Sequence, residues 1–125
     1  MSNPGLTKSY NAEGVIGPFL IVKFGASDFG VLVAAAATDK TIGVTREFGS
    51  VSGEPVDVIH EGIANVKLGG TVTRGDFTTS DASGQAVVAA PATGVNNRVI
   101  GVARQSGVVG DVIEVILTPG HSLQG

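Results

Sequence analysis

The sequence predicts an all-β protein: a small β-barrel or β-sandwich built from a duplicated β unit, with an extended N-terminal arm. Three observations support this fold class. The 125 residues include 19 Gly and 5 Pro, an excess of turn-forming residues that is unfavourable for long helices. Short apolar or alternating segments recur about every 8 to 12 residues with turn residues between them. Two stretches of the chain also repeat one another.

The N-terminal segment is polar. Residues 1–14 contain Pro4 and two glycines and show neither the period of a strand nor that of a helix, so we predict a flexible arm. A single β domain is expected over residues 15–119, followed by a C-terminal tail over residues 120–125 with an exposed His121. The N-terminus lacks a basic start followed by an apolar run, so we expect no secretory signal.

The first strand of the domain is expected over Phe19–Phe24. The run from Val15 onward has no polar residue before Lys23, which is typical of a strand covered on both faces. Pro18 cannot donate a ladder hydrogen bond, so the strand begins near Phe19 or lies at an unpaired edge.

The internal repeat covers about residues 27–59 and 80–116. In each copy a turn with Asp and Gly precedes an Ala-rich segment, and two further strands follow with a Gly-rich loop between them. The offset between matched residues varies from 55 to 58, so the length changes fall in loops, where insertions are tolerated. The matched segments are Leu32–Thr38 with Val87–Thr93, Ile42–Arg46 with Ile100–Arg104, and Gly53–Ile59 with Gly110–Ile116.

Alternation within the repeat indicates half-buried strands. Val56 and Val58 share one face while Asp57 lies on the other, and Glu114 lies opposite its apolar neighbours in the second copy. Each Ala-rich segment is only about one helical turn long, and Pro91 interrupts the second, so we predict a strand or a bend there.

Another short strand is expected between the two copies, over Glu61–Leu68. The pair Gly69-Gly70 after it is typical of a hairpin turn, and a second turn is expected at Arg74-Gly75-Asp76. The spacing of these turns supports a barrel or a sandwich.

The residue types exclude several kinds of site. The chain has no Cys, which excludes disulfides, thiolate metal sites and thiol catalysis. His60 lies at a strand end and matches Leu117 in the repeat, which indicates a structural residue. Val51 stands where a nucleophile elbow needs Ser, and the sequence contains no phosphate or dinucleotide loop. We therefore expect no catalytic residue, no cofactor, no metal and no enzyme activity.

Charge and hydropathy exclude two further kinds of partner. The net charge is −3 and the 8 Lys and Arg residues are scattered, so we expect no nucleic-acid partner. No stretch approaches the roughly 18 to 20 apolar residues of a membrane helix, so we expect no membrane partner. Charged residues make up only 15% of the chain, below the roughly 25% of an average domain, which indicates a surface covered in an assembly.

A longer pattern resembles a known family. The segments G-E-P-V-D-V-I, G-I-A-N-V-K-L-G-G-T-V-T-R-G-D, T-T-S-D-A-S-G-Q-A, I-G-V-A-R and G-D-V-I-E-V-I-L occur in the order found in capsid decoration, or capsid cement, proteins of tailed bacteriophages. The similarity covers Gly25–Pro119 and consists of Gly and apolar positions without a catalytic signature. It implies a structural β subunit that binds the outside of an assembled phage head and stabilises contacts between major capsid protein subunits.

The resemblance also implies partners and contact residues. Such subunits are made in the host cytoplasm and add to the outer surface of the virion head, as homotrimers at local three-fold axes or as dimers at two-folds. The N-terminal arm is then the capsid-contacting segment, and the first strand of the domain covers the capsid or a sister subunit. The implied capsid-contacting residues are Pro4, Leu6, Tyr10, Phe19 and Ile21.

Two other functions stay open at this point. A β-rich phage tail, baseplate or fibre component would use the same oligomeric surface. A small enzyme or ligand-binding barrel would need a pocket with convergent polar groups, and replacing His60 would then remove a measurable turnover. The sequence leaves open the phage, the symmetry axis, and whether oligomers form before they bind the shell.

Overall fold

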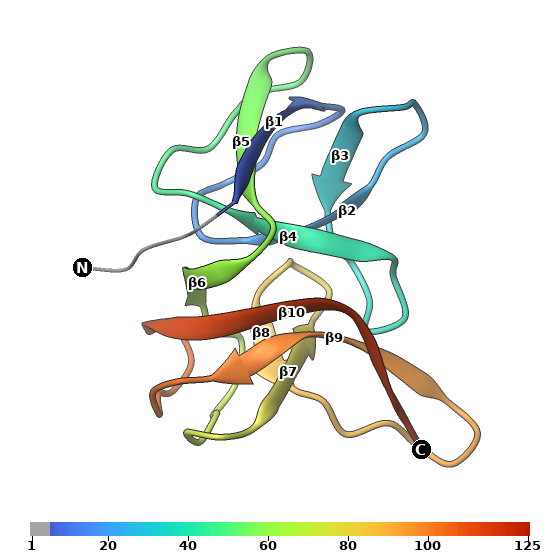
Figure 1. The fold of residues 1–125 in the computed structure, drawn as a ribbon, viewed down its shortest axis with the longest axis vertical. Helices are drawn as coiled ribbons and strands as arrows, with labels where there is room; N and C mark the ends of the chain where they lie inside the picture. Colours follow the sequence, from blue (N-terminus) through green and yellow to red (C-terminus); the bar gives the residue numbers. More distant parts are fainter. Residues whose placement is uncertain (1–5) are drawn as a thin grey trace.

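The computed structural model describes residues 6–125, with residues 119 and 120 described by their backbone alone. Within this range the chain forms two sheets and no helix (Figure 1), which confirms the prediction of an all-β fold. The strands are β1 (Thr7–Ala12), β2 (Ile21–Phe24), β3 (Gly30–Val33), β4 (Thr41–Thr45), β5 (Pro55–Ile59), β6 (Gly62–Lys67), β7 (Phe77–Ser80), β8 (Ala86–Val88), β9 (Asn96–Ala103) and β10 (Val112–Gln124).

The first sheet is a closed barrel with the strand order β1-β3-β2-β4-β5. It occupies the upper half of Figure 1. β1 closes the barrel because it pairs with strands on both sides: it is antiparallel to β5 over Thr7–Asn11 and parallel to β3 at Asn11 and Ala12. Removing β1 would therefore leave two open sheet edges.

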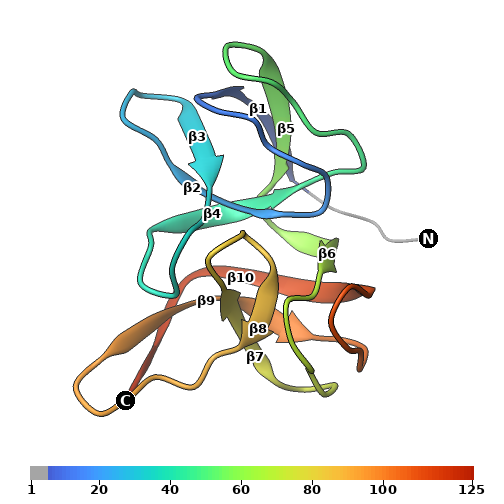
Figure 2. The same cartoon turned by 180° about the vertical axis from the view of Figure 1, so that it is seen from behind.

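The second sheet has five strands in the order β6-β10-β9-β7-β8 and lies below the barrel. Its two outer strands also approach one another, because Leu68, just after β6, forms a parallel bridge with Ala86 of β8. The view from behind shows β8 and the turn before it reaching up towards the barrel (Figure 2).

The two sheets are copies of one β unit. The order β3-β2-β4-β5 of the first recurs as β8-β7-β9-β10 in the second, and β6 lies beside β10 as β1 lies beside β5. The N–H of Ala12 donates to the carbonyl of Glu54 over 2.9 Å, and the N–H of Leu68 donates to that of Asp111 over 2.8 Å. The duplicated unit is therefore longer than the sequence repeat showed. We call β1–β5 the first unit and β6–β10 the second unit.

A pair of matched glycines shows why the copies share their sequence. A Cβ on Gly43 would overlap the carbonyl oxygen of Ile59, and a Cβ on Gly101 would overlap that of Ile116. In both units the neighbouring strand passes so close to the middle of the Ile-Gly-Val strand that only glycine fits there.

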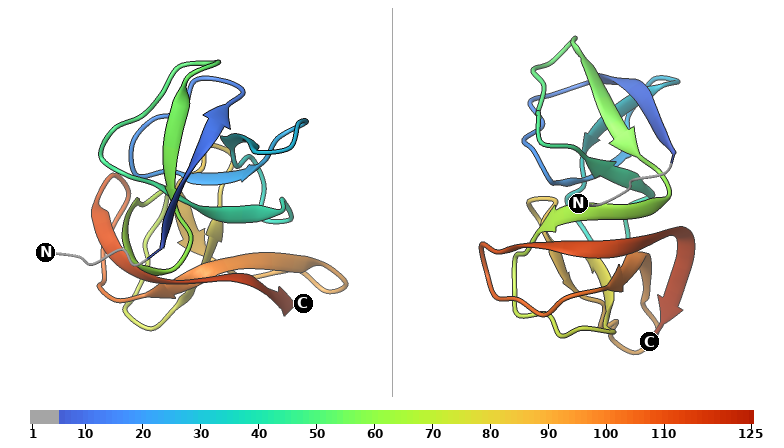
Figure 3. Two further views of the ribbon diagram at one scale, coloured as in Figure 1. Left: turned by 45° about the horizontal axis from the view of Figure 1, so that its top comes forward. Right: turned by 60° about the vertical axis from the view of Figure 1, so that its left-hand side comes forward.

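The core is built from small aliphatic side chains and extends through both units. One cluster joins Ile21 and Val44 of the barrel to Val66, Ile100 and further residues of the second sheet. A smaller cluster is formed by residues of the first unit alone. The two further views in Figure 3 show the units stacked one above the other along this shared core. We therefore describe residues 7–124 as two β units packed on one another.

The alternation predicted from sequence is observed. Val56 and Val58 are buried while Asp57 is exposed, and Val115 is buried beside a half-buried Glu114. The first Ala-rich segment continues from β3 into bends and a turn, as expected from its short length.

The structure corrects the two ends of the predicted domain. Residues 7–12, assigned to a flexible arm, form β1, because Tyr10 and Ala12 pack into the core and the backbone pairs with β3 and β5. Residues 121–124, assigned to a tail, belong to β10 and pair with β9 from His121↔Val99 to Gln124↔Asn96. Both segments are short and mostly polar, so their own sequence does not mark them as strands. Pro4 lies outside the described residues.

Candidate interaction surface

The residues implied as capsid contacts do not form one surface. Leu6 is 43% exposed at the entry to β1, and its carbonyl accepts the N–H of His60 over 2.8 Å. Ile21 is 0% exposed in the core between the two units, so its side chain contacts no partner and this prediction is wrong. Ile21 is instead covered by residues of the second unit of the same chain.

Phe19 lies at the junction of the two units. Its carbonyl accepts the N–H of Lys67 over 2.9 Å, and its own N–H donates to the carbonyl of Arg46 over 3.2 Å. The side chain is half-buried, so part of it stays accessible. The backbone of Phe19 therefore joins the second unit to the barrel.

Tyr10 is half-buried and packs against the smaller core cluster. Its hydroxyl shares a hydrogen bond of 2.8 Å with Nε2 of His60, and the two rings lie 5.4 Å apart. Desolvation by burial raises the pKa of Tyr10 above its ordinary value of 10.0. The pair ties β1 to the end of β5, which is a structural arrangement.

The phenylalanines are the unusual feature of this protein. All five lie outside the buried core, whose apolar residues are Val, Ile, Leu and Ala. Phe24, Phe29 and Phe48 of the first unit are 57%, 75% and 78% exposed, and Phe77 of the second is 49% exposed. Aromatic side chains usually dominate protein cores, and exposed aromatic clusters mark interfaces. The first unit therefore presents an apolar surface for a partner.

The turn between β2 and β3, residues 25–30, carries one part of this surface and is called the Phe29 turn below. Tyr10 and residues 24–29 line a hollow of about 380 Å³. The carboxylate of Glu13 accepts the N–H groups of Ala26 (2.8 Å) and Ser27 (3.0 Å), and it lies against Gly25 and Gly30, where a Cβ would displace it. These bonds hold the turn in one conformation.

The loop between β4 and β5 carries a separate set of exposed apolar residues. Phe48 and Val51 lie in it and are strongly exposed, and the adjoining Val15 is 76% exposed. Two hollows flank the loop: one of about 530 Å³ includes Arg46 and Phe48, and one of about 600 Å³ includes Val15 and Val51. Both are open at the surface, and their lining combines apolar groups with single charges.

The second unit has a smaller apolar hollow of about 230 Å³. Phe77, Val102 and Leu123 line it, with His121 of β10 at its side. Its lining is mainly apolar and carries no group of convergent carboxylates or imidazoles, so the arrangement suits packing against another surface.

Among residues 6–125 no three His, Asp or Glu side chains are placed to hold a metal ion together. In the same part of the chain no helix is long and apolar enough to cross a membrane. Asp57 and Glu114, the matched carboxylates of the repeat, belong to separate sheets. Glu114 forms an ion pair of 2.7 Å with Arg104 at the surface, where it stabilises the sheet only slightly.

Sequence reasoning missed Phe29 and Phe48 as surface residues, and it included Phe24 only as the end of the strand predicted over Phe19–Phe24. A signal for Phe29 was present, because a phenylalanine in the turn Ser27-Asp28-Phe29-Gly30 replaces the small and polar residues that turns prefer. Phe24 is the last residue of β2 and Phe48 follows β4, and nothing in their local pattern separates them from core residues.

Of the comparisons with known proteins, the one with solved structures bears on the fold. No protein-family model matches the chain, and no curated protein matches it in sequence. Among solved structures, it is similar to the crystal structure of the head fibre gp8.5 N base of bacteriophage phi29. The TM-score is 0.68 at 16% sequence identity, and the match covers 90% of this chain and 93% of that chain. The likeness shows that this chain shares the all-β fold of that fibre base.

Proposed function

We propose that this protein is a structural component of a tailed-phage head. The observation that carries the proposal is the likeness to the phi29 head fibre base, which extends over nine-tenths of both chains. The sequence resemblance to capsid decoration proteins supports the same assignment independently of the structure. The exposed Phe24 and Phe29 at the β2–β3 turn of the first unit supply the apolar surface that such a protein needs.

In the finer form of the proposal, the protein adds to the outer surface of the assembled shell and stabilises contacts between major capsid protein subunits. It is not an enzyme and uses no cofactor. A protein that binds the assembled shell but not the free capsid subunits stabilises the shell by mass action. No bond is made or broken in this mechanism.

Self-association belongs to the proposal, with a homotrimer as the leading form and a dimer as the second. An oligomer engages several capsid subunits at once, so the second contact is effectively intramolecular and the overall affinity rises without any new contact. The small hollow that Phe77 and Leu123 line is one surface available to a sister subunit.

A second candidate is the base of a fibre or a related tail or baseplate module. The phi29 neighbour favours it, because that structure is itself the base of a head fibre. The two candidates differ in what the protein carries, since a fibre base also holds a further segment away from the shell.

Co-sedimentation tests the proposal. Expanded heads assembled without this protein, and separately purified tails, are incubated with the purified chain and pelleted. We expect saturable binding to heads. Binding to tails alone would move the protein to the tail or baseplate class, and binding to neither would contradict a structural role in the particle.

A further inference from the structure

The two units differ at positions where the backbone is left-handed. Phe19 (φ 59°) and Phe29 (φ 63°) of the first unit match Gly75 (φ 95°) and Gly84 (φ 73°) of the second. Glycine adopts this conformation freely, whereas a bulky L-residue is strained in it. The first unit therefore keeps two phenylalanines at positions where the same fold elsewhere uses glycine.

The strain at Phe19 has a structural reason, because its carbonyl holds the second unit through the N–H of Lys67. The backbone of Phe29 makes a comparable bond, because its carbonyl accepts the N–H of Asn11 of β1 over 2.8 Å, but this bond does not require a phenylalanine side chain. Its side chain is 75% exposed and contributes little to the core, so a glycine would serve the fold as well. Strained residues that a fold does not require are concentrated at functional sites.

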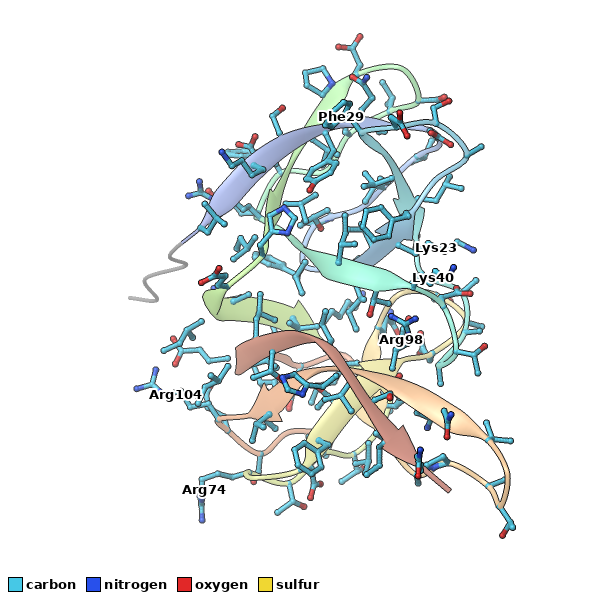
Figure 4. All side chains as sticks on the ribbon, turned by 45° about the vertical axis from the view of Figure 1, so that its right-hand side comes forward. Lys23, Phe29, Lys40, Arg74, Arg98 and Arg104 are labelled. Atoms are coloured by element: carbon cyan, nitrogen blue, oxygen red, sulfur yellow. The ribbon has the colours of Figure 1, made fainter. Side chains whose placement is uncertain are left out.

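The matched turn of the second unit is itself a docking element. Gly84 is buried, its carbonyl accepts the N–H of Ile21 over 2.8 Å, and it lies against Val33 of the barrel. Figure 2 shows this turn, before β8, reaching the barrel. In the first unit the corresponding turn lies at the opposite end, where Figure 4 shows Phe29 far from the second unit. The Phe29 turn of the first unit thus faces outward, and it carries an aromatic side chain where the matched turn of the second unit has a glycine.

The Phe29 turn is also rigid. Besides the two hydrogen bonds to Glu13, the carbonyl of Phe29 accepts the N–H of Asn11 over 2.8 Å, and the N–H of Gly25 donates to the carbonyl of Gly30 over 2.8 Å. Rigid presentation reduces the conformational entropy lost when a partner binds.

The charge around the turn is acidic. Residues 6–61 carry four basic and seven acidic side chains, and residues 62–125 carry four of each, so residues 6–61 carry the whole net charge of −3. Within the described chain Asp28 is exposed and forms no ion pair. Figure 4 shows Lys23 and Lys40 below Phe29, nearer the second unit, and Lys23 is paired with Asp39 over 3.4 Å.

We propose that the Phe29 turn docks onto a basic protein segment of the shell. Phe29 enters an apolar recess of that segment, and Asp28 faces its Lys or Arg side chains. Exposed aromatic anchors flanked by complementary charge are typical of such contacts. This inference rests on the proposed function, and it assigns the contact to the β2–β3 turn of the barrel instead of the N-terminal segment.

The experiment measures the affinity of the full chain for expanded heads assembled without this protein, by co-sedimentation at low and high salt. The chain offers a matched control, because Glu47-Phe48, like Asp28-Phe29, places an acidic residue before an exposed phenylalanine, but in a loop where the backbone of Phe48 is ordinary. Phe29→Ala and Asp28→Lys are therefore compared with Phe48→Ala and Glu47→Lys. Phe29→Gly, whose backbone is relaxed, shows whether a loss of binding reflects misfolding.

We expect Phe29→Ala and Phe29→Gly to weaken binding by roughly 30-fold, as for an interface hot spot. Asp28→Lys weakens it as well, both control variants bind within about threefold of wild type, and high salt weakens wild-type binding. If both pairs of variants lose affinity for heads equally, or if the Phe29 variants bind as tightly as wild type, the inference is overturned. In either case, binding of the wild-type protein to heads still upholds the proposed function. If the affinity of the wild-type protein does not change with salt, the assignment of a basic partner segment is overturned. Failure of wild type to bind heads would reject the proposed function and this inference together.

Discussion

Because the backbone of Phe29 is strained, we expect its glycine variant to be more stable than its alanine variant. At Phe48, which is about equally exposed but not strained, we expect the opposite order of stability. At an ordinary backbone position glycine is less stable than alanine by about 0.5 to 1 kcal/mol, because it loses more conformational entropy on folding. At a left-handed position alanine carries a steric cost of about 1 to 2 kcal/mol that glycine avoids. Phe29 has φ 63°, whereas Phe48 is not among the residues with positive φ.

Phe29→Gly is therefore expected to be more stable than Phe29→Ala by about 0.5 to 1 kcal/mol. At Phe48 the order is reversed by a similar amount. The side chains are 75% and 78% exposed, so the loss of side-chain burial nearly cancels between the two positions. Each position gives a difference in unfolding free energy between its glycine and its alanine variant. Subtracting the difference at Phe48 from that at Phe29 leaves about 1 to 2 kcal/mol, which measures the strain directly.

The assay is urea unfolding of the four variants, followed by far-ultraviolet circular dichroism at one fixed protein concentration, since association would make stability concentration-dependent. Thermal midpoints should differ by about 4 °C for each kcal/mol in a domain of this size. If the Gly–Ala difference has the same sign and size at both positions, Phe29 is not strained and the argument from the matched glycines fails.

Further predictions concern the barrel and the matched strands. Deleting residues 1–14 removes β1 and is expected to unfold the barrel, which circular dichroism and proteolysis would show; a chain beginning at Leu6 keeps every β1 pairing and is the control. Gly101→Ala places a methyl group against the carbonyl of Ile116 and should destabilise the protein by about 1 to 3 kcal/mol in urea unfolding, whereas an unchanged midpoint would contradict the close approach. The single tyrosine, Tyr10, should titrate in the folded protein above 10.0, as followed by tyrosinate absorbance, and return to its ordinary value in urea. Because the raised pKa favours the neutral form, stability should fall as pH rises above 10.0, and Tyr10→Phe should lack this loss.

Much of the fold could be predicted from the sequence, because both units use the same spacing of apolar residues and glycines. Gly43 and Gly101 were matched by sequence, and the structure shows the shared close contact behind the match. β1 could not be recognised, since its place in the barrel depends on pairing with strands far along the chain and its side chains are mostly polar. The last part of β10 was missed for the same reason.

The candidate surface was harder to predict. Ile21 and Phe24 belong to one apolar run, yet Ile21 is covered by the second unit and Phe24 is 57% exposed. Which end of such a strand is covered depends on how the two units pack, and local periodicity carries no information about that. Phe29 was visible as an aromatic residue in a turn, but its strain became evident only when the matched Gly84 showed what the fold itself requires.

The most direct test of the account is to image heads at side-chain resolution after incubating them with the purified protein. We predict density for the protein on the outer surface of the shell, with the barrel against the capsid and the Phe29 turn in the contact. Density that places the second unit against the shell and leaves Phe29 in solvent, or heads that carry no added density at saturating protein, would contradict it.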